Sequence, residues 1–299
     1  MIIVIVGGSG FIGTQLSKRL IDLGHTVVVV DIYPPAFNNK ELFFINCDIT
    51  RQSLPYNILE KTDAVINLVG KPINTKWTEK NKTEILNSRI SSTKHIVESI
   101  VSTNIKPPCF ICASAIGYYG ETLDGTVNET GPKGEGFLAD LVDKWESTAM
   151  LAEKEGVRVV CVRTAPVLGS GGMLRQLKRT AKFGFLLRLK KEDFWMSWIH
   201  QEDIINTYIF ALETKTLQGV FNASAPEPVT HSYFMKSLGT FINRRVIGYI
   251  PKFITKKVFG EFFNEITKSQ QVVPSRLLDK GFVFKYPTLR SAFDQIFKK

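Results

Sequence analysis

Short apolar segments alternate with longer amphipathic segments through the first half of the chain. Apolar runs of strand length occupy residues 2–7, 26–30, 43–46, 64–69, 109–115 and 157–162. Between them, helical spacing of apolar side chains occurs at residues 11–23, 78–102 and 138–155. Strands that are apolar on both faces are typical of a parallel sheet with helices on each side. We therefore predict a doubly wound α/β fold with helical crossovers between parallel strands.

The alternation of strands and helices breaks down beyond about residue 165. Helical spacing recurs in shorter pieces, at residues 174–187, at 201–212 and beyond 226. Residues 195–199 are aromatic and strand-prone between these pieces. We predict one unit over residues 1–165, to which later segments return, and a smaller α-rich C-terminal lobe over residues 166–299.

Composition narrows the class of protein. Of the 299 residues, 44% are hydrophobic, which excludes a wholly disordered chain. No apolar run approaches the roughly 20 residues that a membrane-spanning helix needs. The first residues enter a strand directly, with no basic segment of the kind that opens a secretory signal peptide. We therefore expect a cytoplasmic protein with no membrane partner. Location in an organelle is the alternative, if a targeting presequence is missing from this sequence.

Charge and cysteine content limit the ligands to consider. The chain carries 38 Lys and Arg against 28 Asp and Glu, a formal net charge of +10, but no base-reading module, so we expect no nucleic-acid partner. The densest basic run spans residues 175–191, where a solvated helix face and a site for an anionic substrate are both open explanations. Cys109 and Cys112 lie three apart on a predicted strand and face opposite ways, so we expect no metal site.

A glycine-rich turn links the first predicted strand to the first predicted helix. It reads Gly7-Gly8-Ser9-Gly10-Phe11-Ile12-Gly13. Gly7 permits a tight turn, Gly10 lets the backbone approach a pyrophosphate at the helix N-terminus, and Gly13 lets the helix pack against the strand. Between an apolar strand and an amphipathic helix, this pattern predicts a Rossmann-type dinucleotide site that includes Phe11 and Ile12.

Asp31 ends the second predicted strand, eighteen residues after Gly13. A carboxylate at this point accepts hydrogen bonds from the adenosine ribose hydroxyls and repels a 2′-phosphate. No arginine follows in the sequence Ile32-Tyr33-Pro34-Pro35. We therefore expect NAD as the cofactor in preference to NADP, with Asp31 and Ile32 at the ribose. A solvated aspartate at a strand end is the alternative.

Further motifs resemble the extended short-chain dehydrogenase/reductase family, in which a Rossmann domain carries a small substrate domain. The matching segments lie after the third, fourth and fifth strands and later in the chain. They are Asp48-Ile49, Asn67-Leu68-Val69-Gly70, Ala113-Ser114-Ala115 with Tyr118-Tyr119-Gly120, Val162-Arg163 and Ser197-Trp198-Ile199-His200. The resemblance implies that Asp48 contacts the adenine and that residues 67–70 line the cofactor.

One branch of that family matches almost end to end, the epimerase family proteins with a C-terminal domain of unknown function. Its motifs here include Ser114 to Gly120, Trp145-Glu146 and the closing Gly281-Phe282-Val283-Phe284. The resemblance places the C-terminal domain at about residues 245–295. It also implies a nicotinamide dinucleotide with Leu68, Val69, Glu84 and Arg89 nearby. A surface ion pair of Arg89 with Glu84 or Glu79 is the alternative.

The usual catalytic pair of the resembled family is absent from this chain. Extended dehydrogenases use a Tyr-x-x-x-Lys pair on the helix after the fifth strand, where the lysine helps to lower the pKa of the tyrosine. None of the eight tyrosines is followed four residues later by lysine, and the expected positions hold Leu138 and Val142. The helix is therefore predicted without its acid–base pair.

Four other side chains remain as catalytic candidates, namely Ser114, Tyr118, Tyr119 and His200. Ser114 can hydrogen-bond a substrate oxygen, and each of the other three can donate a proton. For the two tyrosines the alternative is packing over the nicotinamide. For His200 the alternative is a structural hydrogen bond.

Two functions fit these residues. The first is an NAD-dependent epimerase or oxidoreductase acting on a sugar nucleotide or a related polar alcohol or carbonyl. The second is a dinucleotide-binding protein with weak or no catalysis that acts as a redox sensor or interaction partner. The missing pair favours the second function, whereas Ser114 and the complete C-terminal lobe favour the first. We expect a monomer or a homodimer with a small-molecule substrate.

Overall fold

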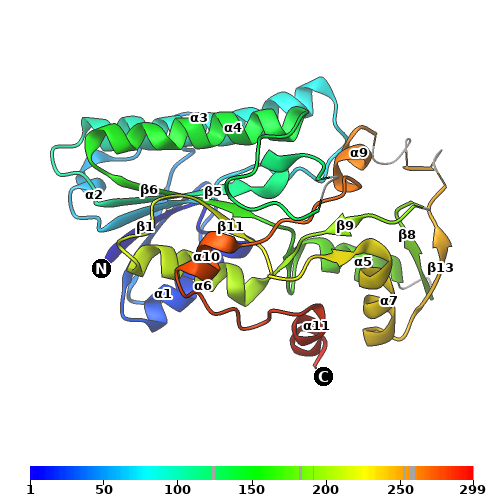
Figure 1. Ribbon diagram of the computed structural model, residues 1–299. Helices are drawn as coiled ribbons and strands as arrows, with labels where there is room; N and C mark the ends of the chain where they lie inside the picture. Colours follow the sequence, from blue (N-terminus) through cyan, green and yellow to red (C-terminus); the bar gives the residue numbers. More distant parts are fainter. Residues whose placement is uncertain (123–124, 182–183, 191, 252–253, 256–259, 299) are drawn as a thin grey trace.

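The computed structural model describes residues 1–299 apart from 123–124, 182–183, 191, 252–253, 256–259 and 299. The central strands are β1 (Ile2–Val6), β2 (Thr26–Asp31), β3 (Leu42–Asn46), β4 (Ala64–Asn67), β5 (Cys109–Ala115), β6 (Arg158–Thr164) and β11 (Gly219–Ala223). They form one seven-stranded parallel sheet in the order β11-β6-β5-β4-β1-β2-β3 (Figure 1). The order reverses between β1 and β4, which is where doubly wound sheets open a crevice for a ligand.

Helices cover both faces of this sheet (Figure 1). The main ones are α1 (Phe11–Asp22) and α6 (Gln201–Glu213) on one face, and α3 (Glu79–Ser102) and α4 (Phe137–Met150) on the other. Shorter turns are α2 (Tyr56–Leu59) and the 3-10 helices η1 (Ile116–Tyr119) and η2 (Leu151–Glu155). Alternate residues of β2 supply the two cores, since Val27 is buried toward α1 and Val28 toward α3. The predicted doubly wound α/β fold is confirmed.

The C-terminal lobe is built from short elements, and several of them surround a separate apolar core. They are β7 (Val167–Leu168), α5 (Gly172–Thr180), β8 (Phe185–Arg188), β9 (Trp195–Met196), β10 (Ile199–His200), β12 (Val229–Thr230), α7 (His231–Phe241), β13 (Arg245–Tyr249), α9 (Phe262–Ile266), α10 (Ser275–Asp279) and α11 (Leu289–Phe297). The strands pair as β7–β10, β9–β12 and β8–β13. Trp198, Phe234 and Phe293 are buried at the centre of this core.

One predicted helix of this lobe is shorter than expected. The spacing of apolar residues predicted a helix over 174–187, but α5 ends at Thr180 and residues 185–188 form β8. The hydrogen bonds of β8 come from β13, which pairs Arg245 with Phe185 and Val246 with Leu186. Because that partner lies about sixty residues further along the chain, local spacing does not reveal it.

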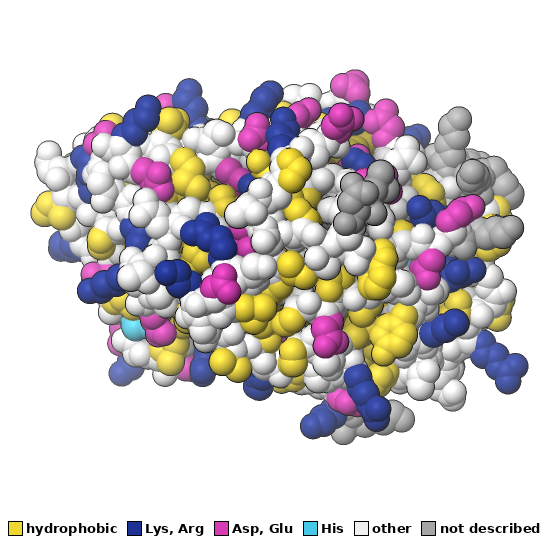
Figure 2. All heavy atoms as spheres, in the orientation of Figure 1, with side chains coloured by type: hydrophobic (Ala, Val, Ile, Leu, Met, Phe, Trp, Pro, Cys, Tyr) yellow, Lys and Arg dark blue, Asp and Glu magenta, His cyan; other side chains and the backbone are white. Residues whose placement is uncertain are grey.

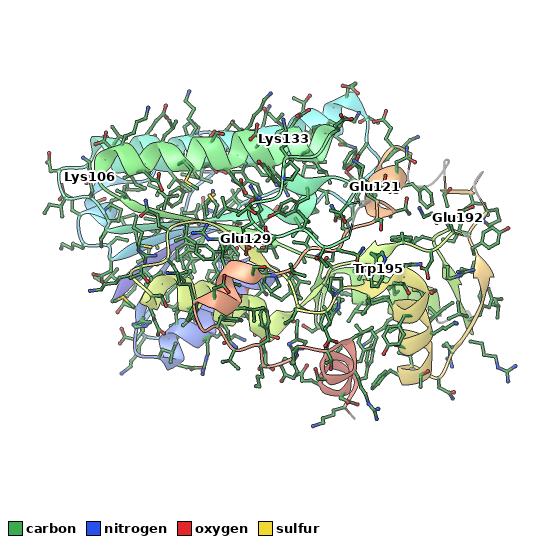
Figure 3. The ribbon with its side chains drawn as sticks, in the orientation of Figure 1. Lys106, Glu121, Glu129, Lys133, Glu192 and Trp195 are labelled. Carbon is green, nitrogen blue, oxygen red and sulfur yellow. The ribbon has the colours of Figure 1, made fainter. Side chains whose placement is uncertain are left out.

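The two halves of the chain interlock rather than meeting at one boundary. The elements α6 and β11 return to the central layers, and the later residues Leu277, Phe282 and Phe284 pack against the core beneath α1. Glu129, labelled in Figure 3, accepts hydrogen bonds from the backbone N–H groups of Asn222 and Arg276 at 3.0 and 3.2 Å. The division at residue 165 therefore stays a prediction. Among the described helices none has the length and apolarity needed to cross a membrane.

Candidate functional site

The glycine turn between β1 and α1 is packed so closely that neighbouring backbone atoms exclude side chains at Gly7 and Gly13. Gly7 has φ +83°, and a Cβ there would lie 3.0 Å from the backbone of Leu68 and of Val69. A Cβ on Gly13 would lie 2.6 Å from the Gly7 carbonyl oxygen and from the Gly8 Cα. Contacts under 3.0 Å are sterically forbidden, so α1 can approach the strands this closely only with glycine at residue 13.

Gly10 occupies the open side of the same turn. A Cβ on Gly10 would meet only the Gly7 carbonyl oxygen, at 3.3 Å. Gly10 is also the N-cap of α1, and no side chain caps this helix end. The helix therefore presents its positive N-terminus, beginning at Phe11 and Ile12, where there is room for an anion.

Gly8 is a third constrained glycine of this turn, and sequence reasoning missed its role. A Cβ on Gly8 would lie 2.8 Å from the side chain of Val29 on β2. The doubled glycine directly after β1 is the signal that could have revealed it. The turn is therefore held between two neighbouring strands as well as against α1.

The Asp31 carboxylate lies beside this turn at the end of β2. It accepts hydrogen bonds from the backbone N–H groups of Ser9 at 3.0 Å and of Tyr33 at 3.3 Å. The adjacent Ile32 is exposed. A negative charge is thus fixed against the open turn by two backbone donors, in the position from which a carboxylate can reach a ribose.

Asp48 and Asn67 both use their side chains to shape backbone turns. Asp48 accepts from the N–H and hydroxyl of Thr50 at 3.1 and 2.6 Å and pairs with Arg51. Asn67 is fully buried, accepts from the Val69 N–H at 3.1 Å and donates to the Thr93 hydroxyl at 2.9 Å. The amide of Asn67 therefore helps to set the path of residues 68–70, and the backbone of Leu68 and Val69 and the side chain of Val69 lie against Gly7.

Arg89 lies next to that path without a carboxylate partner among the described residues. Its guanidinium donates to the carbonyl oxygens of Lys71 and Ile85 at 3.0 and 3.2 Å, and its Cζ lies 5.2 Å from the Trp145 ring centroid. A Cβ on Gly70 would lie 3.0 Å from this guanidinium. Burial lowers the pKa of Arg89 to about 10, which still leaves the group charged at neutral pH.

Among the described residues, Arg89 does not form the ion pair with Glu84 or Glu79 that was the expected alternative. Glu84 pairs with Lys71, and Glu79 pairs with Lys82 at 3.4 Å. The hydrogen bond from Lys71 holds the pKa of Glu84 below its usual value. A cation without a counter-charge beside the glycine turn is a feature expected of a phosphate-binding site.

A buried polar network lies under the carboxyl ends of three neighbouring strands. The sheet register pairs Ser114 of β5 with Arg163 of β6, and Arg163 with Asn222 of β11, so all three side chains share one face. The Ser114 hydroxyl donates to Glu146 of α4 at 2.5 Å. Arg163 donates to both carboxylate oxygens of Glu146, at 2.8 and 2.7 Å. Burial by itself lowers the pKa of Arg163, but the Glu146 carboxylate outweighs it and raises that pKa above its usual value.

Tyr119 completes this network. Its hydroxyl accepts from Arg163 at 2.9 Å and donates to the Asn222 side-chain oxygen at 2.8 Å, and its side chain is 3% exposed. Burial raises the pKa of Tyr119, so it is a weaker acid than a free tyrosine. The hydroxyls of Ser114 and Tyr119 are therefore already engaged inside the protein.

His200 lies apart from this network, in a helix cap. Its Nδ1 accepts from the Glu202 N–H at 3.1 Å as the N-cap of α6, and its Nε2 lies 3.0 Å from Gln295 Oε1. The ring is buried and packs on Tyr286 at 4.0 Å between centroids. Burial lowers the pKa of His200 and favours the neutral ring. With both nitrogens engaged in structural contacts, His200 does not fit the proton-donor role considered from sequence.

Tyr118 differs from the other candidates because its hydroxyl has no hydrogen bond within the described part of the chain. The side chain is half-buried. Its ring lies face-on over Arg163, with 3.4 Å between the guanidinium carbon and the ring centroid. The ring is thus held in one orientation while its hydroxyl stays available.

The helix that usually carries the Tyr-x-x-x-Lys pair has apolar residues at the corresponding positions. Val142 is buried, and Leu138 packs so closely on η1 that a Cβ on Gly117 would lie 3.2 Å from its Cβ. The nearest cation to the tyrosines comes instead from β6, as Arg163. Sequence reasoning noted Glu146 and Arg163 only as landmarks, because no local spacing shows that they meet.

A glycine-rich loop from the C-terminal half lies against the start of α1. A Cβ on Gly171 would lie 2.8 Å from the ring of Phe11, and a Cβ on Gly169 would lie 2.2 Å from the Gln201 side-chain oxygen. The Ser170 N–H also donates to Gln201 at 3.2 Å. The loop therefore borders the open glycine turn and contributes one wall of the site.

Two family models match the chain. The NAD dependent epimerase/dehydratase family matches residues 3–224, and a domain of unknown function, DUF1731, matches residues 250–296. An Arabidopsis thaliana protein, "Epimerase family protein SDR39U1 homolog, chloroplastic", is 33% identical over 99% of this chain and 86% of its own length.

The solved structures that resemble the whole chain include two that share at least 25% sequence identity with it. The human epimerase family protein SDR39U1, solved with NADPH, is 28% identical with a TM-score of 0.89 and covers 100% of both chains. A nucleoside-diphosphate sugar epimerase from Corynebacterium glutamicum is 25% identical with a TM-score of 0.79 and covers 99% of this chain and 58% of that one.

Proposed function

The chain belongs to the NAD dependent epimerase/dehydratase family, and from this premise we propose that it binds a nicotinamide dinucleotide and acts on a polar alcohol or carbonyl such as a sugar nucleotide. The observation that carries the proposal is the turn at Gly10. Side chains are excluded at Gly7 and Gly13 by close backbone contacts, whereas a Cβ on Gly10 would meet only the Gly7 carbonyl oxygen, at 3.3 Å, at a helix N-terminus that no side chain caps. That combination suits a pyrophosphate.

The surrounding residues fit the rest of such a cofactor. Asp31 offers a carboxylate at the ribose end, and the backbone of Leu68 and Val69 lines the turn. Arg89, which has no carboxylate partner in the described part of the chain, offers a cation to a phosphate. When bound, the dinucleotide supplies a nicotinamide carbon that accepts or donates hydride. The chain itself contributes binding, orientation and exclusion of water.

We propose NAD rather than NADP as the preferred cofactor, because a 2′-phosphate would approach the Asp31 carboxylate. The human relative was solved with NADPH, so the preference of this chain needs its own measurement. Calorimetric titration with NAD⁺ and NADP⁺ should show tighter binding of NAD⁺. The Asp31→Asn variant keeps an acceptor for the Ser9 N–H but loses the charge. It should therefore narrow the difference in affinity between NAD⁺ and NADP⁺. Tighter binding of NADP⁺ to the unaltered protein would contradict the preference.

For catalysis we propose Tyr118 as the proton-donating hydroxyl, held by the guanidinium of Arg163 against its ring. Oxidation of NADH should be screened against a panel of sugar nucleotides and small carbonyl compounds. For any compound turned over, Tyr118→Phe should lower the rate by about 10²–10⁴-fold, the usual contribution of a positioned acid or base. The Tyr233→Phe variant is a matched control, since Tyr233 is exposed on α7. Unchanged turnover in Tyr118→Phe would exclude this role.

A second candidate function is a dinucleotide-binding sensor or interaction partner with weak or no catalysis. One observation favours it: the polar groups of Ser114, Tyr119 and His200 are all engaged in internal hydrogen bonds. Tight binding of NAD(H) without turnover of any compound in the panel would select this function over the first.

Location and assembly stay predictions. We propose a cytoplasmic protein that is a monomer or homodimer, although the Arabidopsis relative is named as chloroplastic. Cell fractionation tests the location, and light scattering of the purified protein tests the assembly. A trimer or larger assembly would contradict the second prediction.

A further inference from the structure

A basic groove lies in the C-terminal lobe, lined entirely by residues outside the cofactor turn. Its volume is about 940 Å³, and it runs between α7 and the paired strands β8 and β13. Four cations line it, from three separate segments: Arg188, Lys236, Arg244 and Arg245. Figure 2 shows Lys and Arg side chains at the end of the molecule that carries β13 and α7, as on other parts of this face. This volume falls within the range of small-molecule sites.

One wall of the groove is a single face of α7. Ser232, Lys236, Gly239 and Thr240 are spaced at i, i+4, i+7 and i+8, so they follow one stripe of the helix. Gly239 is required here for a separate reason, because a Cβ would lie 2.5 Å from the carbonyl oxygen of Arg244. The helix and the segment after it are therefore in direct backbone contact.

The end of α7 fixes where the two adjacent arginines begin. The Arg244 N–H donates to the Gly239 carbonyl at 2.8 Å, and the Asn243 N–H donates to the Thr240 carbonyl at 3.3 Å. This is the Schellman pattern, with Asn243 in the left-handed region at φ +53°. The groove is thus set by a defined helix end rather than by a loose loop.

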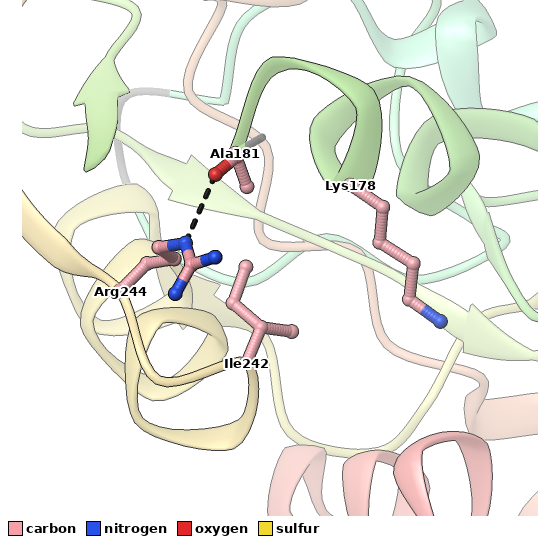
Figure 4. A pocket seen from close by; sticks show the side chains of 4 residues that line it. All are labelled: Lys178, Ala181, Ile242 and Arg244. Carbon is pink, nitrogen blue, oxygen red and sulfur yellow. Dashed lines mark hydrogen bonds between the residues drawn. The ribbon is translucent and has the colours of Figure 1, made fainter. Parts of the chain in front are cut away.

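The guanidinium of Arg244 is itself anchored. Its Nε donates to the Ala181 carbonyl at 3.0 Å, and its Nη1 donates to the Asn243 carbonyl at 2.9 Å. Figure 4 shows the first of these bonds, with Arg244 facing a smaller adjoining cavity of about 260 Å³ lined also by Lys178 and Ile242. A guanidinium fixed in this way has lost part of its side-chain entropy before any ligand arrives.

The four cations have no carboxylate partner among the described residues. None of them forms an ion pair there, and no acid lines the groove. The nearby Asp193 is engaged by the N–H and hydroxyl of Ser232 and by the Phe194 N–H. Compensation of the α7 dipole accounts for one or two cations at its C-terminus, but not for Arg188 on a different strand.

From this arrangement we propose that the groove binds a small molecule carrying two or more phosphate groups, at a site separate from the cofactor turn. Arginine forks match phosphate oxygens with paired hydrogen bonds, and a concave wall of like charge concentrates anions. The proposal also gives a use to one part of the basic run at 175–191, because Arg188 belongs to that run. It is independent of the proposed reaction at the cofactor turn.

The test uses inorganic pyrophosphate as the probe, and its binding is measured by calorimetry at low salt. Because pyrophosphate could also enter the cofactor turn, the titration is made in the Gly10→Val protein and in the unaltered protein saturated with NAD⁺. Pyrophosphate should bind in both. The double variant Arg244→Gln/Arg245→Gln should weaken that binding by about tenfold or more, since two charge-assisted contacts are lost.

Matched variants separate geometry from net charge. The Arg244→Lys/Arg245→Lys variant keeps the charge but loses the forked guanidinium groups. Its affinity for pyrophosphate should lie between those of the unaltered protein and the Arg244→Gln/Arg245→Gln variant. Lys40→Gln/Lys61→Gln removes two exposed lysines before β3 and β4, and it should bind pyrophosphate unchanged. The arginine and lysine variants, unlike Gly10→Val, should bind NAD⁺ like the unaltered protein.

Several outcomes would overturn the proposal. They are no pyrophosphate binding at millimolar concentration, binding that disappears in Gly10→Val, and binding that is the same in the Arg244→Gln/Arg245→Gln protein. Selective binding of duplex DNA through these arginines, without pyrophosphate binding, would also overturn it, because the ligand would then be a nucleic acid.

Discussion

The buried pair of Glu146 and Arg163 offers a sharp test of how the site is built. Replacement of Glu146 by Gln keeps the side-chain volume and an acceptor for the Ser114 hydroxyl, but it removes the charge. The two side chains are 8% and 4% exposed and are joined by two hydrogen bonds at 2.7 and 2.8 Å. The variant therefore leaves a buried guanidinium without a counter-charge, which costs about 3–5 kcal/mol of unfolding free energy.

Urea unfolding, followed by tryptophan fluorescence and circular dichroism, measures this loss. The Glu98→Gln variant is a matched control, because Glu98 pairs with Lys94 on the exposed face of α3, where both side chains are more than half exposed. An exposed pair contributes at most about 1 kcal/mol. The control should therefore unfold almost like the unaltered protein.

A double variant shows whether the two charges act together. Arg163→Met alone should be strongly destabilising, because Glu146 would then be buried without its partner. Glu146→Gln combined with Arg163→Met should be less destabilising than the sum of the two single changes, since no uncompensated charge remains. A loss below about 1 kcal/mol for Glu146→Gln, or strict additivity in the double variant, would refute the reasoning.

Two further predictions follow from the glycine turn and from a buried histidine. Gly10→Val should abolish dinucleotide binding in calorimetry with little loss of stability. Gly13→Val should lose both dinucleotide binding and stability, because its Cβ would lie 2.6 Å from the Gly7 carbonyl oxygen. Equal effects of the two changes would contradict this prediction. Burial lowers the pKa of His231 from 6.5 to about 4, so the unfolded chain takes up a proton first and stability falls as pH drops from 6.5 toward 4. His231→Phe keeps the stacking on Phe194 and should flatten this part of the plot of unfolding free energy, measured with urea, against pH. An unchanged plot would exclude His231 as the cause.

Much of the fold and part of the site could be predicted from the sequence alone. Strands such as 109–115 were predicted with the bounds that β5 has, because a run of residues buried on both faces is a local signal. The glycine turn was equally readable, because glycine is required where backbone segments touch. The family resemblance is confirmed by the match to residues 3–224 and by the C-terminal match to residues 250–296.

Other features were decided only by the tertiary structure. Ser114, Arg163 and Asn222 lie far apart in sequence and become neighbours because β5, β6 and β11 pair in one register. In the folded protein the Ser114 hydroxyl is bonded to Glu146, so that Tyr118 is the catalytic candidate whose hydroxyl stays available among the described residues. The basic groove likewise needs Arg188 and Arg245 brought together by β8 and β13. Pairing between distant strands depends on the whole sheet and its covering helices, so no local pattern of residues encodes it.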